Sequence, residues 1–117
     1  MSPDRTEQTR ATFEHHLQAI FAKDVDAIME DFAEDAVLFT PDGLLRGADK
    51  VREFFIGFVA NLTPEMLANF SATRQEVDGE IAYVVWTIGD IIPFGTDTFV
   101  VRDGKIVTQT VAMYVPS

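Results

Sequence analysis

The stretch GTDTFVVRDGKIVTQTVAMYVPS, residues 95–117, decides the fold of this chain. Two runs rich in β-branched and aromatic residues flank Asp103-Gly104, a pair typical of the tight turn of a β-hairpin. A two-residue turn would place Asp97 opposite Thr110, whereas a three-residue turn with a left-handed Gly104 would place Asp97 opposite Gln109. We favour the three-residue turn, because it gathers apolar side chains on one face of the hairpin: Phe99, Val101, Val107, Val111 and Met113.

Two polar residues, Asp97 and Gln109, interrupt that apolar face. A carboxylate on an apolar sheet face costs on the order of several kcal/mol unless it is paired, protonated or facing a cavity. The pair is therefore the best functional clue in the chain, and it predicts either a pocket or a buried polar network on the inner face of the sheet.

The composition indicates a single domain, residues 1–117, of ordinary apolar content (47%) and charge content (24%). The net charge of −10, from 19 acidic and 9 basic residues, argues against nucleic acid and an anionic membrane surface as partners, because both need a basic footprint. No apolar run approaches ~20 residues and no signal peptide is evident, so the expected location is cytoplasmic. There is no cysteine and no His/carboxylate cluster with ligand spacing, so we expect neither a metal nor a cofactor.

Apolar periodicity in the first half predicts three helices. The first starts at Ser2-Pro3-Asp4, a capping serine followed by a proline, and buries a stripe that ends at Phe21. The second is capped by Asp24, and the third follows Gly47 and ends before Thr63-Pro64. Gly57 lies inside the third helix, where we expect it to permit a close contact.

The second half predicts strands over residues 37–40, 44–46, 70–77 and 81–88, followed by the terminal hairpin. Residues 63–68 are ambiguous between a helical turn and a loop, and residues 90–95 predict a loop. In the strand over 81–88 the even positions are all apolar, which places Trp86 toward the core. Helices first and mainly antiparallel strands afterwards predict an α+β domain, with the helices on one face of a curved sheet.

Three stretches carry a resemblance to a known superfamily: KDVDAIMEDFAEDAV (23–37), Arg46-Gly47 running into VREFF (51–55), and RDGKI (102–106). With the order of the elements, they resemble the nuclear transport factor two-like superfamily, in particular its SnoaL-like and ketosteroid-isomerase-like members. The resemblance covers nearly all of the chain. It implies a cone-shaped, mainly antiparallel but mixed sheet, with the three helices of the N-terminal half on its concave face and a pocket inside. Because this fold hosts isomerases, cyclases, hydrolases, dehydratases and non-catalytic domains, it does not by itself name an activity.

The match to ketosteroid isomerase is partial. The isomerase's oxyanion-hole aspartic acid falls on Asp97, but its general-base aspartate falls on Thr40 and its tyrosine at about His16. Since that reaction needs a carboxylate base, steroid isomerisation is not expected. The Asp-Arg-Asp arrangement of limonene-epoxide-hydrolase-like members also loses support, because Gly95 and Thr96 precede Asp97. SnoaL-like cyclases, which use a carboxylate as acid and base in an apolar pocket, remain compatible.

Two hypotheses follow for the function. In the first, the chain is a small cofactor-free enzyme that acts on a small apolar carbonyl-containing substrate. Asp97 carries the proton or donates to the oxyanion, His16 is its partner in a His–Asp dyad, and Gln109 orients the substrate. The other candidate substrate-binding residues are Thr40, Trp86, Phe54, Phe58, Phe99 and Met113. In the second hypothesis, the domain only binds a small molecule or mediates dimerisation, and the three polar residues satisfy one another.

The outer face of the sheet predicts self-association. If Trp86 faces the cone, the opposite face carries apolar side chains that are unusual on a solvated surface: Tyr83, Val85, Ala112 and Tyr114. We therefore expect a two-fold homodimer through this face, as the resemblance also implies.

Overall fold

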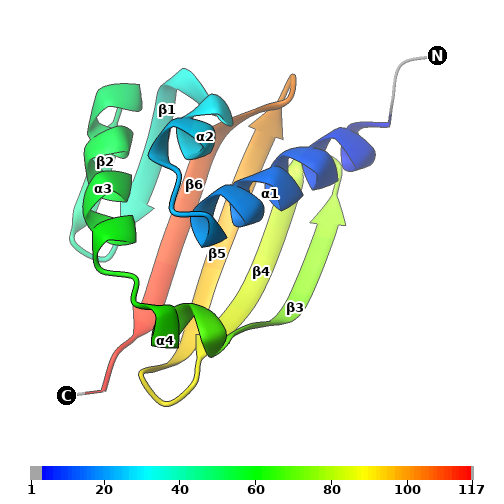
Figure 1. Cartoon of the computed structure of the whole chain (residues 1–117). Helices are drawn as coiled ribbons and strands as arrows, with labels where there is room; N and C mark the ends of the chain where they lie inside the picture. The colour runs from blue at the N-terminus through cyan, green and yellow to red at the C-terminus, as the bar shows by residue number, and fades with distance from the viewer. Residues whose placement is uncertain (1–3, 117) are drawn as a thin grey trace.

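The computed structural model describes residues 4–116 (Figure 1). Within this range the elements follow in the order α1 (Arg5–Phe21), α2 (Val25–Glu30), β1 (Phe32–Thr40), β2 (Gly43–Arg46), α3 (Ala48–Ala60), α4 (Pro64–Ala68), β3 (Phe70–Asp78), β4 (Ile81–Ile88), β5 (Ile92–Arg102) and β6 (Lys105–Tyr114). The strands form one curved, open sheet in the order β2-β1-β6-β5-β4-β3, and the helices cover one face of it. The expected α+β class, with a mixed sheet and helices from the N-terminal half, is confirmed.

The C-terminal hairpin forms the middle of the sheet. Strand β6 pairs in parallel with β1 on one side and antiparallel with β5 on the other, whereas the remaining pairs are all antiparallel. Helix α1 crosses β3, β4 and β5, and α3 lies along β1 and β2 (Figure 1). The inner face of β5 and β6 therefore lies beneath the helices. This is the face on which the sequence predicts the polar pair Asp97 and Gln109.

Side-chain caps define the helix starts. Asp4 caps α1 by accepting a hydrogen bond from the backbone N–H of Thr6 at 3.2 Å, and Asp24 caps α2 in the same way. Ser2 and Pro3 of the expected first cap lie outside the described residues. Phe21 is 40% exposed and not buried as expected, because it stands at the end of α1, where its ring packs edge-on against Phe70.

The turn of the β5–β6 hairpin differs from the one that we favoured. Arg102 pairs with Lys105 around a two-residue turn. Both turn residues, Asp103 (φ 53°) and Gly104 (φ 77°), have positive φ, which is the conformation of a turn that matches the twist of the flanking strands. The prediction of a three-residue turn is therefore wrong.

A β-bulge just beyond this turn keeps the predicted face in spite of the wrong turn. Because the register shifts there, Asp97 pairs with Val111 and not with Gln109. Gln109 lies diagonally from Asp97 on the same face of the sheet, so the two side chains still meet. Ile106 is fully buried and Val107 only half-buried, which reverses the order expected near the turn.

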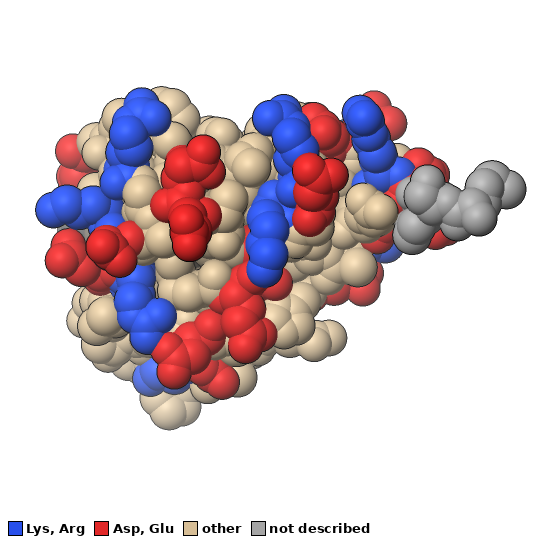
Figure 2. Space-filling model, turned by 90° about the horizontal axis from the view of Figure 1, so that it is seen from above, with Lys and Arg blue, Asp and Glu red and all other residues tan. Residues whose placement is uncertain are grey.

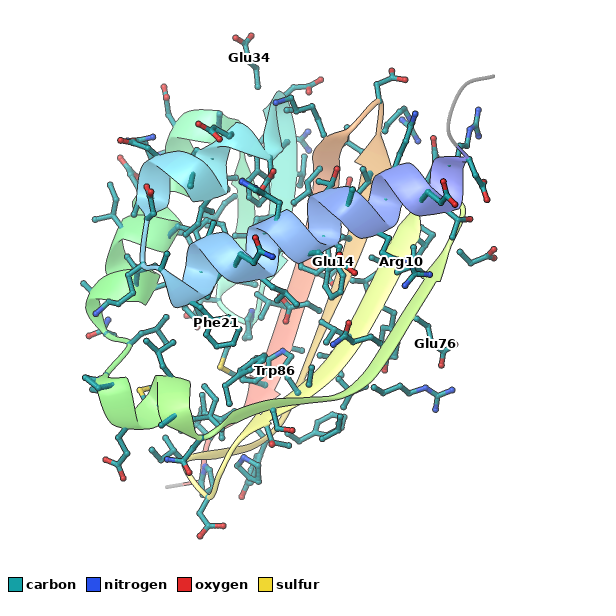
Figure 3. All side chains as sticks on the ribbon, turned by 45° about the vertical axis from the view of Figure 1, so that its right-hand side comes forward. Arg10, Glu14, Phe21, Glu34, Glu76 and Trp86 are labelled. Carbon is teal, nitrogen blue, oxygen red and sulfur yellow. The ribbon has the colours of Figure 1, made fainter. Side chains whose placement is uncertain are left out.

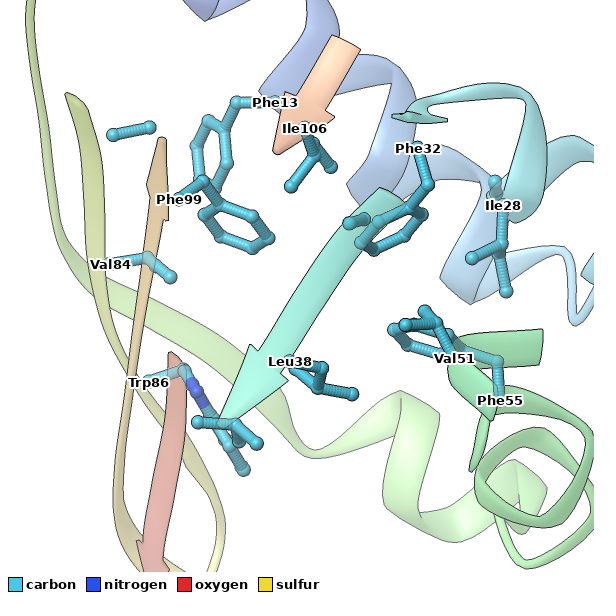
Figure 4. Close-up of a cluster of buried hydrophobic side chains, with 14 of the residues drawn as sticks. Phe13, Ile28, Phe32, Leu38, Val51, Phe55, Val84, Trp86, Phe99 and Ile106 are labelled. Carbon is cyan, nitrogen blue, oxygen red and sulfur yellow. The ribbon is translucent and has the colours of Figure 1, made fainter. Parts of the chain in front are cut away.

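The core fills the space between the helices and the concave face of the sheet. Its fully buried side chains come from both layers, and Figure 4 shows Phe13 of α1 packed against Phe99 of β5. Trp86 faces this core as predicted and is 6% exposed. Gly57 permits no close contact, since a Cβ added there would meet nothing within 4 Å, so that expectation is wrong.

Most charged side chains lie on the outside. In the view of Figure 2, lysine and arginine side chains are interleaved with aspartate and glutamate instead of forming one basic area. None of the helices in residues 4–116 combines the length and the apolar character that crossing a membrane requires.

Candidate functional site

A cavity of about 70 Å³, measured as the space open to the centre of a water-sized sphere, lies between the helices and the concave face of the sheet. Its wall comes from the C-terminal part of α1, from α3 and α4, and from strands β3 to β6. Figure 3 shows Phe21 and Trp86 in the space between α1 and the sheet. The wall is apolar except for His16, Asp97, Gln109 and the indole N–H of Trp86. At about 10–15 Å³ for one water, the space holds roughly five waters or a ligand of about one ring.

Two neutral donors hold the carboxylate of Asp97. Trp86 donates its Nε1–H to Oδ1 at 2.8 Å, and Gln109 donates from Nε2 to Oδ2, also at 2.8 Å. Burial raises the pKa of Asp97 to about 6, although both hydrogen bonds favour the charged form and act in the opposite direction. The carboxyl group therefore changes its protonation state close to neutral pH.

The close approach of Trp86 to Asp97 depends on a glycine. Gly95 pairs with Trp86 across β4 and β5, and a Cβ added at Gly95 would lie 2.4 Å from Cε2 of the indole. The indole thus rests on the bare backbone of Gly95, while the ring of Phe70 stacks on it with a centroid distance of 6.0 Å. Any larger residue at position 95 would push the indole away from the carboxylate.

His16 lies inside the aromatic core as a neutral base. It is 2% exposed, and its ring packs edge-on against Phe32, Phe55 and Phe99. Burial lowers the pKa of His16 to about 3, so the imidazole carries no charge at neutral pH. Its Nδ1 has no hydrogen-bond partner, and no hydrogen bond joins it to Asp97 within the described part of the chain.

A family model for the SnoaL-like domain matches residues 13–109, which include all of these polar residues. The chain belongs to the SnoaL-like domain family. No curated protein sequence matches it.

Solved structures share the fold of this SnoaL-like chain. A nuclear transport factor two-like protein of unknown function from Burkholderia xenovorans is 23% identical, with a TM-score of 0.76 over 97% of this chain and 88% of that one. Another, from Mesorhizobium loti, is 22% identical, with a TM-score of 0.76 over 97% of both chains. A candidate ketosteroid isomerase from Kribbella flavida is 22% identical, with a TM-score of 0.71 over 97% of this chain and 85% of that one. At these identities the likeness shows a common fold.

The structure brings together most of the residues singled out from the sequence. Asp97, Gln109 and His16 line one cavity, together with Trp86, Phe54, Phe58 and Phe99. The arrangement differs from the expected His–Asp dyad, because the partners of the carboxylate are Trp86 and Gln109. The indole donor was not anticipated, since a strand pattern reports which face Trp86 occupies but not which residue it reaches across the sheet.

Thr40 and Met113 lie outside the cavity wall, although both were expected to contact substrate. The hydroxyl of Thr40 donates to the carbonyl of Gly43 at 2.9 Å and so belongs to the β1–β2 turn. Met113 is half-buried and pairs with Gly95 near the end of β6. Conversely, Phe21 and Phe70 line the cavity. Sequence reasoning assigned Phe21 to the core and Phe70 only to a strand, because their common position depends on how α1 lies over β3.

A second ionisable pair lies apart from the cavity. Nδ1 of His15 is 2.9 Å and 2.8 Å from the two carboxylate oxygens of Asp31. Hydrogen bonding to Asp31 raises the pKa of His15. Burial raises the pKa of Asp31, and His15 opposes that shift. The pair links α1 to Asp31, the residue that directly follows α2.

Among residues 4–116, no group of three or more histidine or acidic side chains is arranged to hold a metal ion.

Proposed function

We propose that this SnoaL-like domain binds a small apolar carbonyl compound in its cavity and moves a proton on it, with Asp97 as the proton carrier. One observation carries the proposal: a carboxyl group is held inside an apolar cavity by two neutral donors, and its pKa is raised to about 6. A group with such a pKa accepts and returns a proton near neutral pH, which is what general acid–base catalysis requires.

The chemistry assigns a role to each polar group. Ionised Asp97 removes a hydrogen as a proton from the carbon next to the substrate carbonyl. The C–H bond breaks, an O–H bond forms on Asp97, and the electron pair moves onto the carbonyl oxygen. Neutral His16 lines the same cavity and supports this step as a hydrogen-bond donor that needs no positive charge. Return of the proton to another carbon, or ring closure at the enolate, gives an isomerase or a cyclase reaction.

Trp86 and Gln109 are positioning residues in this scheme. Because Trp86 can only donate, its N–H keeps one face of the Asp97 carboxylate fixed. Gln109 holds the second oxygen. The apolar wall limits the water around the carboxylate, which would otherwise stabilise it and lower its basicity.

Exchange of carbon-bound hydrogen with solvent tests this function without knowledge of the natural substrate. Acetophenone is a suitable probe, since it has one ring and exchangeable hydrogens next to a carbonyl. Incubated in D₂O and followed by proton NMR, it is expected to lose these hydrogens faster with the wild-type protein than with buffer. Asp97→Asn should abolish the acceleration, whereas Asp90→Asn, the same change in an exposed loop, should retain it.

The alternative is a non-catalytic binding domain on the same fold. It is favoured by the fact that both oxygens of Asp97 already have hydrogen-bond partners. Binding of acetophenone at the Trp86 side of the cavity, with no acceleration of exchange, would reject catalysis and support this alternative.

We also propose that two copies of the chain associate through the outer face of the sheet. Tyr114 is 61% exposed on this face. Although the chain has 28 charged residues, none of them stands in the two central rows of cross-strand neighbours on β4, β5 and β6. One row consists of Tyr83, Thr98 and Thr110, and the other of Val85, Thr96 and Ala112. An uncharged, partly apolar face of this kind suits a two-fold interface.

Sedimentation velocity at micromolar concentration tests the association. The wild-type protein is expected to sediment as a dimer, and Ala112→Arg as a monomer, because arginine would place two like charges in the centre of the interface. Ala60→Arg, at the exposed end of α3, is the matched control and should remain dimeric. A wild-type protein that sediments only as a monomer would refute the proposal.

A further inference from the structure

Within residues 4–116, no side chain that lines the cavity carries a charge opposite to that of ionised Asp97. Asp97 and His16 are the only ionisable residues among the described ones that line it, and no lysine or arginine reaches it from the helices or from the strands. His16 is neutral, because burial lowers its pKa to about 3. Ionised Asp97 is therefore held by neutral donors alone.

A buried acceptor without a partner lies beside this carboxylate. Gln109 is 3% exposed, and its Nε2 donates to Asp97, while its Oε1 has no hydrogen-bond partner. Both atoms belong to one amide group, so the unpaired oxygen is carried by the same side chain that holds the carboxylate. A buried polar atom left unpaired is costly, and a ligand that donates a hydrogen bond to it would remove this cost.

The carboxylate can also accept further hydrogen bonds. Each of its oxygens has two acceptor positions, and Trp86 and Gln109 each use one. The polar end of the cavity thus offers the Asp97 carboxylate as an acceptor to whatever enters, and Gln109 lines the same cavity. This set matches a ligand whose polar group has several N–H donors and a positive charge.

The remaining wall suits a cation on an apolar body. Aromatic rings surround the cavity, among them Phe54, Phe58, Phe70, Trp86 and Phe99. The faces of aromatic rings attract cations, and the attraction is stronger where water is excluded. The net charge of −10 acts in the same direction, because it raises the local concentration of cations.

We infer that the cavity binds small primary ammonium ions attached to a single ring, with the ammonium group donating to the Asp97 carboxylate and to Oε1 of Gln109. This ligand class is distinct from the carbonyl compound proposed above and binds the ionised form of the site. It rests on the proposed use of the cavity as a small-molecule site, and it does not require catalysis. The size of the cavity suits a ring with a short arm.

Benzylamine and benzyl alcohol are matched probes, because they differ in the charge and donor number of the terminal group. Trp86 is the only tryptophan, and it contacts the carboxylate, so its indole N–H resonance in a ¹H–¹⁵N spectrum reports binding at this site. At pH 8 benzylamine is expected to bind roughly tenfold or more tightly than benzyl alcohol, as for a charge-assisted contact. Primary amines stay protonated in this range, as lysine does with a pKa of about 10.4. The preference should therefore disappear near pH 5, where Asp97 is protonated.

Two variants separate the charge from the free acceptor. Asp97→Asn should bring the affinity for benzylamine down to that for benzyl alcohol, while Asp90→Asn should keep the wild-type preference. Gln109→Leu removes the free oxygen together with the Nε2 donor to Asp97, and it is expected to weaken benzylamine several-fold more than benzyl alcohol, provided that its circular dichroism spectrum is unchanged. Equal affinities of wild type for the two probes at pH 8, or a preference that survives Asp97→Asn, would overturn the inference.

A third probe distinguishes this inference from the function on which it rests. Acetophenone binding at the indole resonance without benzylamine binding would overturn the ammonium inference and leave the carbonyl proposal intact. If none of the three probes shifts the resonance, the cavity is not a small-molecule site and both proposals fail.

Discussion

Replacing Asp97 by asparagine should stabilise the fold at pH 8 and change little at pH 4. The pKa of Asp97 rises from 3.8 to about 6 on folding, and this shift corresponds to about 3 kcal/mol. Because the folded state holds the proton more tightly, the stability that Asp97 provides is complete below pH 3.8 and is lost as the pH rises through 6. Asparagine does not ionise, so the variant retains that stability. The difference at pH 8 is at most about 3 kcal/mol, since the side chain is partly exposed to water in the cavity.

The hydrogen bonds around position 97 can survive this change. The oxygen of asparagine still accepts from Trp86. The new amide nitrogen faces Gln109, whose side-chain amide can turn over so that its free Oε1 becomes the acceptor. The flip exchanges one unpaired atom of Gln109 for the other, because Nε2 loses its acceptor when Oε1 gains a donor, so the number of hydrogen bonds stays the same.

Urea unfolding followed by far-ultraviolet circular dichroism at pH 4, 6 and 8 measures the difference directly. His16 does not disturb the comparison. Its lowered pKa makes both proteins lose stability as the pH falls below 6.5, and the two losses cancel. Asp90→Asn is the control and should change the free energy of unfolding by less than about 0.5 kcal/mol. A variant that is less stable than wild type at pH 8, or a difference that does not vary with pH, would refute the reasoning.

Two further predictions concern the support of the site and the charges of the histidines. Gly95→Ala should lower the free energy of unfolding by about 1–3 kcal/mol in the same denaturation experiment, because the new Cβ would overlap the indole of Trp86. Gly57→Ala is the control and should be neutral or stabilising, because nothing lies within 4 Å of a Cβ added there. In an NMR titration, the pKa of His15 should lie above 6.5 and should return toward its ordinary value in Asp31→Asn. The ring of His16 should show no titration above pH 5. A His16 ring that titrates near 6.5 would show that it is not buried.

The inner face of the hairpin was predictable although its turn was not. Alternation of apolar residues places Asp97 and Gln109 on the same face of the β5–β6 hairpin. This holds for the register of the favoured three-residue turn and for any register shifted from it by an even number of residues. The favoured turn and the observed turn with its bulge differ by two residues in the pairing of Asp97, so the face is the same. The pattern cannot reveal the bulge, because a bulge depends on the fit of the whole strand pair.

The partners of the site residues were not predictable. His16 stands at the edge of the apolar stripe of α1, and its burial follows from that position. Whether it reaches Asp97 depends on how α1 lies across the sheet, and α1 places it among phenylalanine rings instead. Thr40 was a candidate by its place in the resemblance, but its hydroxyl is used by the turn that follows β1.

By itself, the sequence determined the α+β class, the cap at Asp24, the apolar faces of the strands, and the presence of a carboxylate on the face that the helices cover. These properties depend on residues close together in the chain, where propensity and periodicity act. The tertiary structure alone decided that Trp86 and Gln109 hold Asp97, that Gly95 makes room for the indole, and that no lysine or arginine of residues 4–116 lines the cavity beside the carboxylate. Such contacts join three strands and require distances near 2.8 Å, which only the register of the complete sheet sets.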